Sequence, residues 1–334
     1  MKNNIFLTTI ITLSFIAFSL FLIREISFAQ NVSIGVYPPI MQMDTTPPAN
    51  PKADFFLTNP SDQSLELSIS YKPFKPKGTK NGEIELSDDL SSFPDPLFVN
   101  RVKILEEDEP VKSVVLSPKQ NKKLTLELQL PPNEQKGDYY FTILFSSRPT
   151  TNIKANSSLL YPTIGMNVLL TVGPKGKTEG YISRFSVPLF VDSGPVVFNV
   201  EIANRSDHFI SPTSEITIKN LTTGKKDIVS LLPVNILANT VRAIPDSLQA
   251  EVGSSEYEKI RDIVERQDSP VAVYPKKFLL GFYNATLNVS LEETQTKFTK
   301  SITFFAFPIS LLLGIVVLLG IVVFIVLRVR KKIS

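Results

Sequence analysis

The middle of the chain alternates apolar and polar residues with a period of two, which is the pattern of β-strands that bury one face. The alternation is clearest at 65–71 and 124–130 in the first half and at 198–202 and 283–289 in the second. One apolar and one polar face per strand is typical of antiparallel sheets packed face to face. The 25 prolines interrupt the strands often. The sequence therefore predicts an all-β fold of sandwich architecture.

Two turn patterns recur at nearly the same offset, which indicates two copies of one β unit. Asn59 and Asn204 follow strand-like segments, each with Ser two residues and Asp three residues later, and they are 145 positions apart. Gly137 and Gly281, which precede strand-like segments, are 144 positions apart. Asn and Asp suit such turns because their side chains bond the nearby backbone. We therefore expect two tandem immunoglobulin-like β-sandwiches.

A short polar break separates the two predicted domains. Gly173-Pro174-Lys175-Gly176-Lys177 follows a strand-like segment that ends at Val172. Domain one is then predicted at 30–172, the linker at 173–177 and domain two at 178–301. Each domain is long enough for a core of its own. That core must come from Phe and aliphatic residues, because the chain has no Trp and no Cys.

The C-terminal region contains a long uncharged segment followed by a basic tail. Residues 302–327 carry no charge, and residues 328–334 hold four cations. A bilayer core about 30 Å thick needs about 20 apolar residues in a helix, and flanking cations mark the cytoplasmic side. We expect a transmembrane helix at 302–327, oriented by Arg328, Arg330, Lys331 and Lys332. This predicts a single-pass protein of the cell membrane with an extracytoplasmic N-terminal ectodomain.

The N-terminus fits the same orientation. Lys2 precedes an uncharged run at 5–23, and small residues at Ser27 and Ala29 match the cleavage rule for a secretory signal. We expect a signal peptide at 1–29, cleaved between Ala29 and Gln30. An uncleaved signal anchor is the alternative, and either way the middle of the chain lies outside the cell.

Composition favours a bacterial cell envelope as the compartment. Secreted animal domains of this size usually carry disulfides, and this chain has no cysteine. The six Asn-x-Ser/Thr sequons are read as chance occurrences in polar strand-rich sequence. The two ends hold six cations and one Glu, which leaves the rest of the chain at a net charge near −2 although the formal total is +3, and the remaining Lys and Arg are scattered. A nucleic-acid partner would need clustered cations, so none is expected.

Three segments depart from the alternating pattern. The Ser255–Arg266 segment has a capping-box start and an apolar helical face, which predicts a helix at 255–266 that packs over domain two, with a partner-binding protrusion as the alternative. Pro73–Gly82 is predicted to be a Lys- and Pro-rich loop. The acidic run 106–109 lacks the alternating oxygen ligands and turn glycine of a calcium loop, so we expect a solvated loop there.

Several short motifs resemble those of bacterial surface domains of the immunoglobulin-like, pilus-chaperone-like class. They are Asn59-Pro60-Ser61-Asp62, Leu116-Ser117-Pro118-Lys119, the alternating Leu124–Leu130, Pro131-Pro132 and Gly137-Asp138-Tyr139. The whole layout resembles the WxL-interacting proteins of Gram-positive bacteria. That resemblance implies peptidoglycan contact by the first domain and a host or partner protein for the second. It assigns no individual binding residue.

Enzymatic chemistry finds little support in the sequence. The single histidine, His208, follows the Asn204–Asp207 turn and is expected to be a turn residue. Without cysteine, and with one histidine, thiol catalysis and multi-histidine metal sites are excluded. No serine lies in a nucleophile elbow, and no glycine-rich phosphate loop is present. We expect a non-enzyme without cofactor or metal, although a carboxylate pair for glycoside hydrolysis needs only spatial proximity and stays open.

The function expected from these features is binding or scaffolding at the bacterial envelope. Exposed strand edges and loops would dock a wall polymer or a surface protein, with the principal contacts on the distal domain. The alternative is an accessory subunit of a membrane complex for secretion or transport, in which Ser310 and Gly314 let helices approach. An envelope hydrolase is a third and weaker hypothesis.

Overall fold

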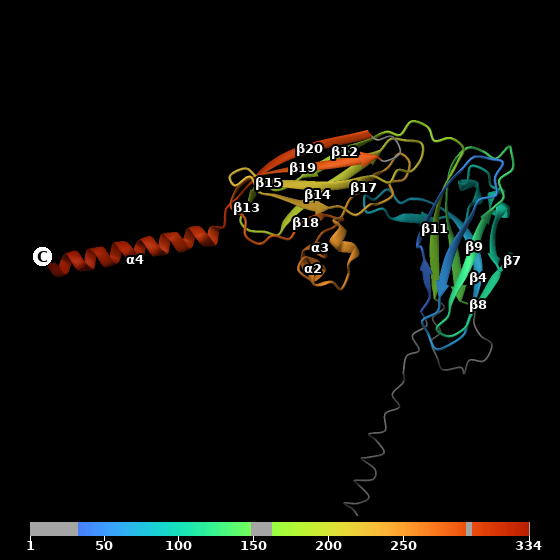
Figure 1. Ribbon diagram of the computed structural model, residues 1–334, viewed down its shortest axis with the longest axis horizontal. Helices are drawn as coiled ribbons and strands as arrows, with labels where there is room; N and C mark the ends of the chain where they lie inside the picture. Colours follow the sequence, from blue (N-terminus) through green and yellow to red (C-terminus); the bar gives the residue numbers. More distant parts are fainter. Residues whose placement is uncertain (1–32, 148–161, 292–295, 334) are drawn as a thin grey trace, which may run out of the picture.

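The computed structural model describes residues 33–147, 162–291 and 296–333, and within the last helix it describes the side chains of Ile309 and of residues 312–328. Figure 1 shows two β domains set at an angle, with one long helix leaving the second domain at the end remote from the first. The predicted signal peptide and its cleavage site at Ala29 and Gln30 lie outside the described residues.

Domain one is a sandwich of two sheets. The first sheet has the order β1-β3-β9-β6-β7 and the second the order β2-β11-β10-β4-β5, with β8 also paired to β4. The strands of the first sheet are β1 (Gly35–Tyr37), β3 (Lys52–Thr58), β9 (Asn121–Leu128), β6 (Val102–Glu106) and β7 (Glu109–Val111). Those of the second are β2 (Ile40–Thr45), β11 (Thr163–Val172), β10 (Gly137–Ser147), β4 (Leu65–Pro76), β5 (Ile84–Leu86) and β8 (Ser113–Leu116). Two short 3-10 helices, η1 (Leu90–Ser92) and η2 (Phe98–Arg101), lie between β5 and β6.

Domain two repeats this plan. One sheet joins β12, β14 and β17 in that order, with β18 also paired to β14, and the other has the order β13-β20-β19-β15-β16. The strands of the first sheet are β12 (Gly180–Ser186), β14 (Val196–Asn204), β17 (Val241–Ala243) and β18 (Ala272–Tyr274). Those of the second are β13 (Phe190–Val191), β20 (Thr296–Ala306), β19 (Gly281–Leu291), β15 (Thr213–Asn220) and β16 (Lys226–Ser230). The predicted β fold is thus confirmed, and residues 173–177, predicted to be the linker, fall between β11 and β12.

Each domain begins with two successive strands, the first paired in one sheet and the second in the other. In domain one β1 pairs antiparallel with β3, and β2 then pairs parallel with β11. In domain two β12 pairs antiparallel with β14, and β13 then pairs parallel with β20. The shared exchange of sheets agrees with the internal repeat that the turn patterns predict.

The two asparagines that revealed the repeat make equivalent hydrogen bonds. Asn59 Nδ2 lies 2.6, 3.3 and 3.0 Å from the carbonyl oxygens of Gln63, Leu116 and Ser117. Asn204 Nδ2 lies 2.8, 2.9 and 3.1 Å from those of His208, Ile236 and Leu237. In each turn the asparagine Oδ1 accepts from the backbone N–H two residues later. Both side chains are buried, so each amide fastens its turn to a second loop of its own domain.

Each sandwich has its own apolar core, built as expected from aliphatic residues and phenylalanine. In domain one Tyr139, Phe141, Ile143 and Phe145 of β10 are fully buried and pack across the sandwich. The corresponding residues of β19 in domain two are Tyr283, Ala285, Leu287 and Val289. The alternation read from the sequence at 283–289 therefore identifies the inward face of β19 correctly.

The predicted helix at 255–266 is two short helices, α2 (Ser255–Glu258) and α3 (Arg261–Val264), preceded by the 3-10 helix η3 (Ser247–Ala250). Ser254 rather than Ser255 caps α2, with its hydroxyl accepting from Tyr257 N. Ile260 between the helices is fully buried in a small cluster with Val271 and Val273. This segment thus packs over domain two, as expected, and the interruption at Ile260 lets that side chain point inward.

The helix boundary predicted at 302 is wrong, and so is the end of domain two at 301. Residues up to Ala306 belong to β20, and α4 (Ile309–Ile333) begins only after Pro308. Phe304 and Ala306 are buried and pair in register with Tyr283 and Gly281 of β19. The uncharged segment 302–327 therefore contains the apolar end of β20 and most of α4, and the absence of charge does not show where the strand ends and the helix begins.

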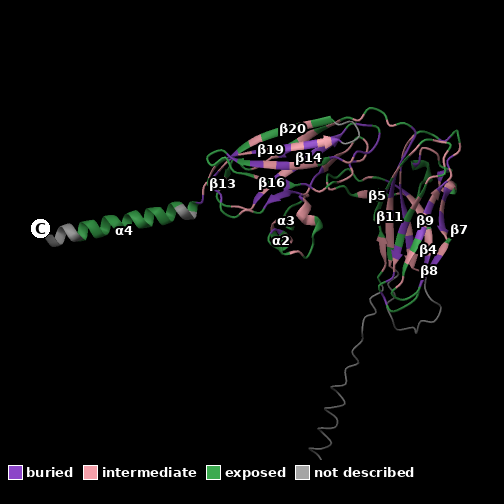
Figure 2. Cartoon of the chain, viewed as in Figure 1, coloured by how far each residue is buried: buried purple, intermediate pink, exposed green. Residues whose placement is uncertain are grey.

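The described side chains of α4 are large and apolar from Leu312 to Leu327 except for two glycines, and all are exposed in the isolated chain, as the colouring in Figure 2 shows. Among the residues that the structure describes, no helix is both long enough and apolar enough to cross a membrane.

Replacing the buried turn asparagines should destabilise each domain separately. Asn59→Ala and Asn204→Ala each leave buried carbonyls and an N–H without their partner, which should lower the free energy of unfolding of that domain by about 3 kcal/mol. Urea unfolding of the full chain in detergent would measure the effect. Asn121→Ala, at an exposed site, is the control and should change the stability by less than about 0.5 kcal/mol. Equal stabilities for all three variants would contradict the role given to the buried amides.

Candidate functional site: the joint between the two domains

The joint begins as a patch of apolar side chains on the outer face of a domain-one sheet. Phe74 of β4 stacks on Tyr140 of β10 with ring centroids 5.8 Å apart, and Leu169 of β11 lies in the same cluster. From domain two, Phe209 and Leu237 pack against them. Phe74, Leu169 and Phe209 are buried, so the face that would otherwise meet water is covered by loops of the second domain.

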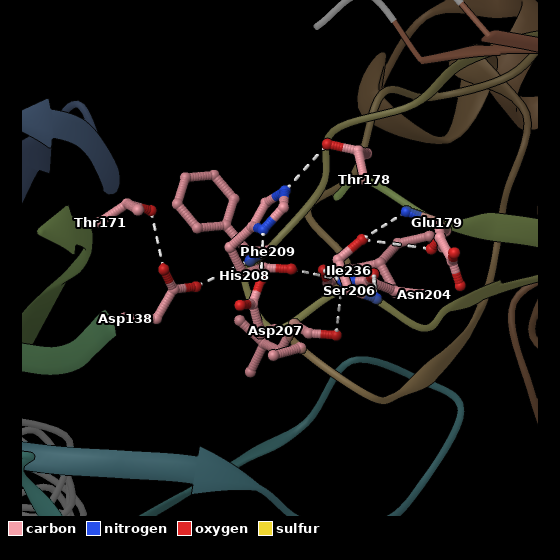
Figure 3. Close-up of polar contacts among 12 residues, drawn as sticks. Asp138, Thr171, Thr178, Glu179, Asn204, Ser206, Asp207, His208, Phe209 and Ile236 are labelled. Atoms are coloured by element: carbon pink, nitrogen blue, oxygen red, sulfur yellow. Dashed lines mark hydrogen bonds and ion pairs between the residues drawn. The ribbon is translucent and has the colours of Figure 1, made fainter. Parts of the chain in front are cut away.

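A carboxylate at the centre of this patch binds both domains. Asp138 Oδ2 accepts from the backbone N–H of Phe209 at 2.7 Å, and Oδ1 accepts from Thr171 Oγ1 at 2.8 Å (Figure 3). The Tyr140 hydroxyl also donates to Asp138, and it accepts from Ala238 N of domain two at 3.3 Å. Two backbone groups of domain two are therefore held by side chains of one strand, β10.

Burial of this network shifts the acidity of its members. Burial raises the pKa of Asp138 above the ordinary value, against the opposing effect of the hydrogen bonds that it accepts from Tyr140, Thr171 and Phe209. Burial, and after it the neighbouring Asp138 charge, raises the pKa of Tyr140. The phenol therefore stays protonated and remains a donor to the carboxylate.

The segment predicted as a Lys- and Pro-rich loop is a hairpin that reaches across to domain two. β4 continues to Pro76 and pairs with β5, so that the residues between them form the tip. Lys80 O accepts from Ala243 N at 2.8 Å, and Lys80 Nζ lies 2.8 Å from Glu201 Oε2. Glu201 is nearly buried and Arg184 is its second cation, at 3.7 Å. The hairpin thus extends the joint beyond the apolar patch.

A buried guanidinium lies beneath the same hairpin. Arg242 Nη1 donates to Asn235 O at 2.5 Å, and burial lowers the pKa of Arg242. Gly82 has φ +77° and lies so close that an added Cβ would be 2.4 Å from Arg242 Cζ. The left-handed backbone favours glycine here, and a Cβ at this position would also have to displace the end of the Arg242 side chain.

A cavity of about 90 Å³ lies between the hairpin, β11 and the loop before β17. It is lined by residues of both domains, among them Ile40, Phe74, Leu169, Leu237 and Arg242. Pockets for small organic ligands are roughly 300 Å³ or larger, so this cavity has the size of a packing gap that holds a few waters. The geometry of the joint fits a fixed connection between domains better than a small-molecule site.

His208, the only histidine, belongs to the joint rather than to an exposed turn. Its ring is 2% exposed; Nε2 lies 3.0 Å from Thr178 Oγ1 and Nδ1 lies 2.8 Å from Asp207 Oδ1 (Figure 3). Thr178 directly follows the linker. Asp207 also lies close to Gly176 of the linker. The position in a turn is as expected, and the side chain fastens the linker to that turn.

Other predicted features carry no site. Glu107 and Asp108 form the tip of the β6–β7 turn with positive φ, and both are exposed. Among the described residues, no group of three or more His, Cys, Asp or Glu side chains is arranged to hold a metal ion. Arg328, Arg330, Lys331 and Lys332 lie in α4, and of these only the Arg328 side chain is described.

The joint itself was not anticipated from the sequence. Asp138 and Tyr140 occupy alternate positions of β10, on the face that the alternation assigns to solvent. Their burial comes from the second domain, and a pattern within one strand carries no information about that. Phe209, an apolar residue in a polar turn, was the available signal.

Adding a side chain to the hairpin should weaken the joint at one glycine and hardly at another. Gly78 and Gly82 both have positive φ, so alanine at either costs about 1 kcal/mol in the backbone, but only Gly82 lies against Arg242. Because the chain has no cysteine, dyes on Leu97→Cys and Thr223→Cys can report the distance between domains. We expect Gly82→Ala to broaden that distance distribution and Gly78→Ala to leave it unchanged. Equal distance distributions for the two variants would show that the contact between Gly82 and Arg242 does not help to fix the position of the domains.

The raised pKa of Asp138 predicts a characteristic pH dependence. A folded-state pKa above the unfolded value means that stability falls as pH rises through that interval. Wild type should therefore lose stability relative to Asp138→Asn as pH increases from the ordinary Asp pKa through the raised one. Asp54 is the matched opposite, because its hydrogen bonds with Lys123 and Thr125 lower its pKa, so wild type should gain relative to Asp54→Asn as pH rises through that lower range. Urea titrations at several pH values would measure both slopes, and a slope of the same sign for both would be inconsistent with the burial of Asp138.

No protein-family model matches the chain, and no curated protein sequence matches it. Solved structures with a similar arrangement include the class 5 fimbriae chaperone CfaA, at 11% identity and TM-score 0.38, covering 80% of this chain and 98% of that one. They also include the Escherichia coli chaperone DraB, at 9% identity and TM-score 0.34, covering 83% and 98%. A third is the CsuC–CsuE chaperone and tip adhesion subunit pre-assembly complex of Acinetobacter baumannii, at 8% identity and TM-score 0.33, covering 63% and 89%. These neighbours are pilus-chaperone proteins built from β-sandwich domains.

Proposed function

We propose that the chain is a membrane-anchored, extracytoplasmic binding or scaffolding protein of the bacterial cell envelope. The observation that carries this proposal is α4, whose described side chains are apolar and exposed on every side. A helix that is apolar all round is stable only when protein or lipid covers it. No described part of the two β domains covers the side chains from Leu312 to Leu327, so we infer that lipid covers them.

The length and flanks of α4 support the same anchoring. Its 25 residues extend about 37 Å at 1.5 Å per residue, against a hydrocarbon core of about 30 Å. Its last eight residues include Arg328, Arg330, Lys331 and Lys332, which favour a cytoplasmic C-terminus. Both sandwiches would then lie outside the cell, consistent with the proposed signal peptide at 1–29.

The connection between β20 and α4 determines where the domains stand. Only Phe307 and Pro308 separate the strand from the helix, and Ile309 N donates to Asp192 Oδ1 at 2.5 Å. Domain two is therefore held next to the bilayer. Domain one lies at the opposite end of domain two (Figure 1), held there by Asp138, Tyr140 and the hairpin. The distal domain is the part best placed to meet a partner.

Strand addition is the mode of binding that the sheets allow most directly. Among the described terminal strands of domain one, β1, β5 and β7 have three residues each, which limits pairing with another chain. β2 has six residues and a single sheet neighbour, β11. Ile40, Gln42 and Asp44 are exposed along it. We propose that a partner strand adds to β2, with main-chain hydrogen bonds supplying affinity.

The partner class remains a protein or a wall polymer of the envelope. The finer resemblance to WxL-interacting proteins stays a prediction and is part of this proposal. Strand addition requires a polypeptide, so the β2 edge favours a surface protein over peptidoglycan as the partner of domain one.

A membrane-impermeant maleimide that carries a photo-crosslinking group would test topology and partner contact together in intact cells. Four single-cysteine variants suffice, because the chain has no cysteine of its own. Gln42→Cys and Val115→Cys report on domain one, Ile228→Cys on an edge strand of domain two, and Ser334→Cys on the tail. We expect labelling of the first three only, and crosslinks to a protein from Gln42→Cys.

Three results would contradict different parts of the proposal. Labelling of Ser334→Cys in intact cells, or protection of the other three, would overturn the orientation. Labelling as expected with crosslinks only from Ile228→Cys would transfer the binding surface to domain two. Crosslinks that depend on α4, lost when the helix is exchanged for an unrelated one, would favour the accessory-subunit hypothesis.

A further inference from the structure

A ladder of phenylalanines lies on the surface of domain two beside the start of α4. Phe282 of β19 and Phe305 of β20 are register partners with ring centroids 4.7 Å apart. Phe190 of β13 is the register partner of Phe305 on its other side, at 6.2 Å, and Phe307 follows at 6.3 Å. Phe282 is 55% exposed and Phe190 is 50% exposed, so the ladder is not part of the core.

Further apolar side chains are gathered at the same end of the sandwich. Leu189, whose carbonyl accepts from Phe305 N, is 81% exposed. Leu221, whose N–H donates to Phe282 O, is 51% exposed, and Phe278 is 60% exposed. Backbone hydrogen bonds thus connect Leu189 and Leu221 to the ladder, and Phe278 lies three residues before the start of β19. We call this set, with the four phenylalanines, the proximal surface.

The charges around the proximal surface are mainly positive. Lys225, Lys226 and Lys277 are exposed in the two loops that carry Leu221 and Phe278. Lys276 is partly exposed and lies 3.2 Å from Asp227, whose other partner is Tyr274. Asp192 is the second carboxylate at this end, and it accepts from Ile309 N. Four lysines thus stand against two carboxylates, both of which already have partners.

Aromatic rings beside lysines are the composition of a protein surface at a membrane–water boundary. Phenylalanine and leucine side chains insert at that boundary when lysines lie beside them, and the lysines are attracted to an anionic leaflet. An exposed apolar patch of this kind requires a partner, and the bilayer is the one that α4 brings within reach. Because only two residues separate β20 from α4, the ladder cannot be more than a short distance from the point where the helix enters.

We propose that the proximal surface docks on the outer leaflet of an anionic bilayer, with the phenylalanine ladder inserted at its polar–apolar boundary. This inference rests on the proposed anchoring by α4 and adds to it a second contact with lipid. Domain two then has a fixed orientation on the membrane. Because the joint holds domain one against domain two, the orientation of domain one relative to the membrane is fixed as well.

Single tryptophans in the full chain would test the contact, since the chain contains none. Phe282→Trp reports on the proximal surface, Val317→Trp on the middle of α4, and Tyr37→Trp, at a site 71% exposed in domain one, is the matched distal control. Each variant is reconstituted into two sets of phosphatidylglycerol–phosphatidylcholine vesicles, whose acyl chains are brominated near the glycerol end in one set and near the terminal methyl group in the other, so that both the polar–apolar boundary and the bilayer centre are probed. We expect Phe282→Trp and Val317→Trp to lose fluorescence and Tyr37→Trp to keep it.

The three positions separate the possible failures. Quenching of Val317→Trp without Phe282→Trp would overturn the docking proposal and leave the anchor in place. Absence of quenching at Val317→Trp would overturn the anchor itself. Equal quenching at Tyr37→Trp would also overturn the proposal, because the contact would not be specific to the proximal surface. Adding Lys225→Glu and Lys226→Glu to Phe282→Trp should reduce its quenching on phosphatidylglycerol vesicles and leave Val317→Trp unaffected, whereas an unchanged signal would remove the role of charge.

Discussion

The Asp138 carboxylate is the constraint on which the arrangement of the two domains depends. It accepts a backbone hydrogen bond from Phe209 across the joint and, through Tyr140, orients a second acceptor for Ala238. A half-buried carboxylate of this kind is unfavourable alone and is retained because its donors are in place. Around it, the apolar patch of Phe74, Leu169 and Phe209 and the contacts of Lys80 in the hairpin complete the connection between the domains.

The rest of the molecule is a repeat modified for two environments. Both domains keep the buried asparagine turn and the first strand that exchanges sheets. They differ at their outer ends. Domain one presents short terminal strands and the longer β2, whereas domain two presents exposed phenylalanines and lysines around the origin of α4. One ancestral plan would thus have acquired a partner-facing end and a lipid-facing end.

Much of the fold can be read from the sequence because it is encoded locally. Alternation identified the inward faces of β9 and β19, and the offsets of Asn59 and Gly137 revealed the repeat. Local patterns failed where two structures share one composition: uncharged residues at 302–306 are strand and those from Ile309 onward are helix. They failed again at the joint, because Asp138 and Tyr140 lie on a polar face that only the fold of the whole chain removes from water. The turn at His208 was predicted, but its burial against the linker was not.

The two-residue connection between β20 and α4 has a mechanical meaning for a protein tethered at one end and bound at the other. A pull on domain one would enter domain two near β12 and leave it through the carboxyl end of β20. β20 is held along eleven register pairs to β19, and in Figure 1 it runs toward α4 along the length of the domain. Tension would therefore load those pairs together in shear instead of opening them one after another. Such a strand resists force better than one peeled from its end, which would suit a protein anchored and bound as proposed.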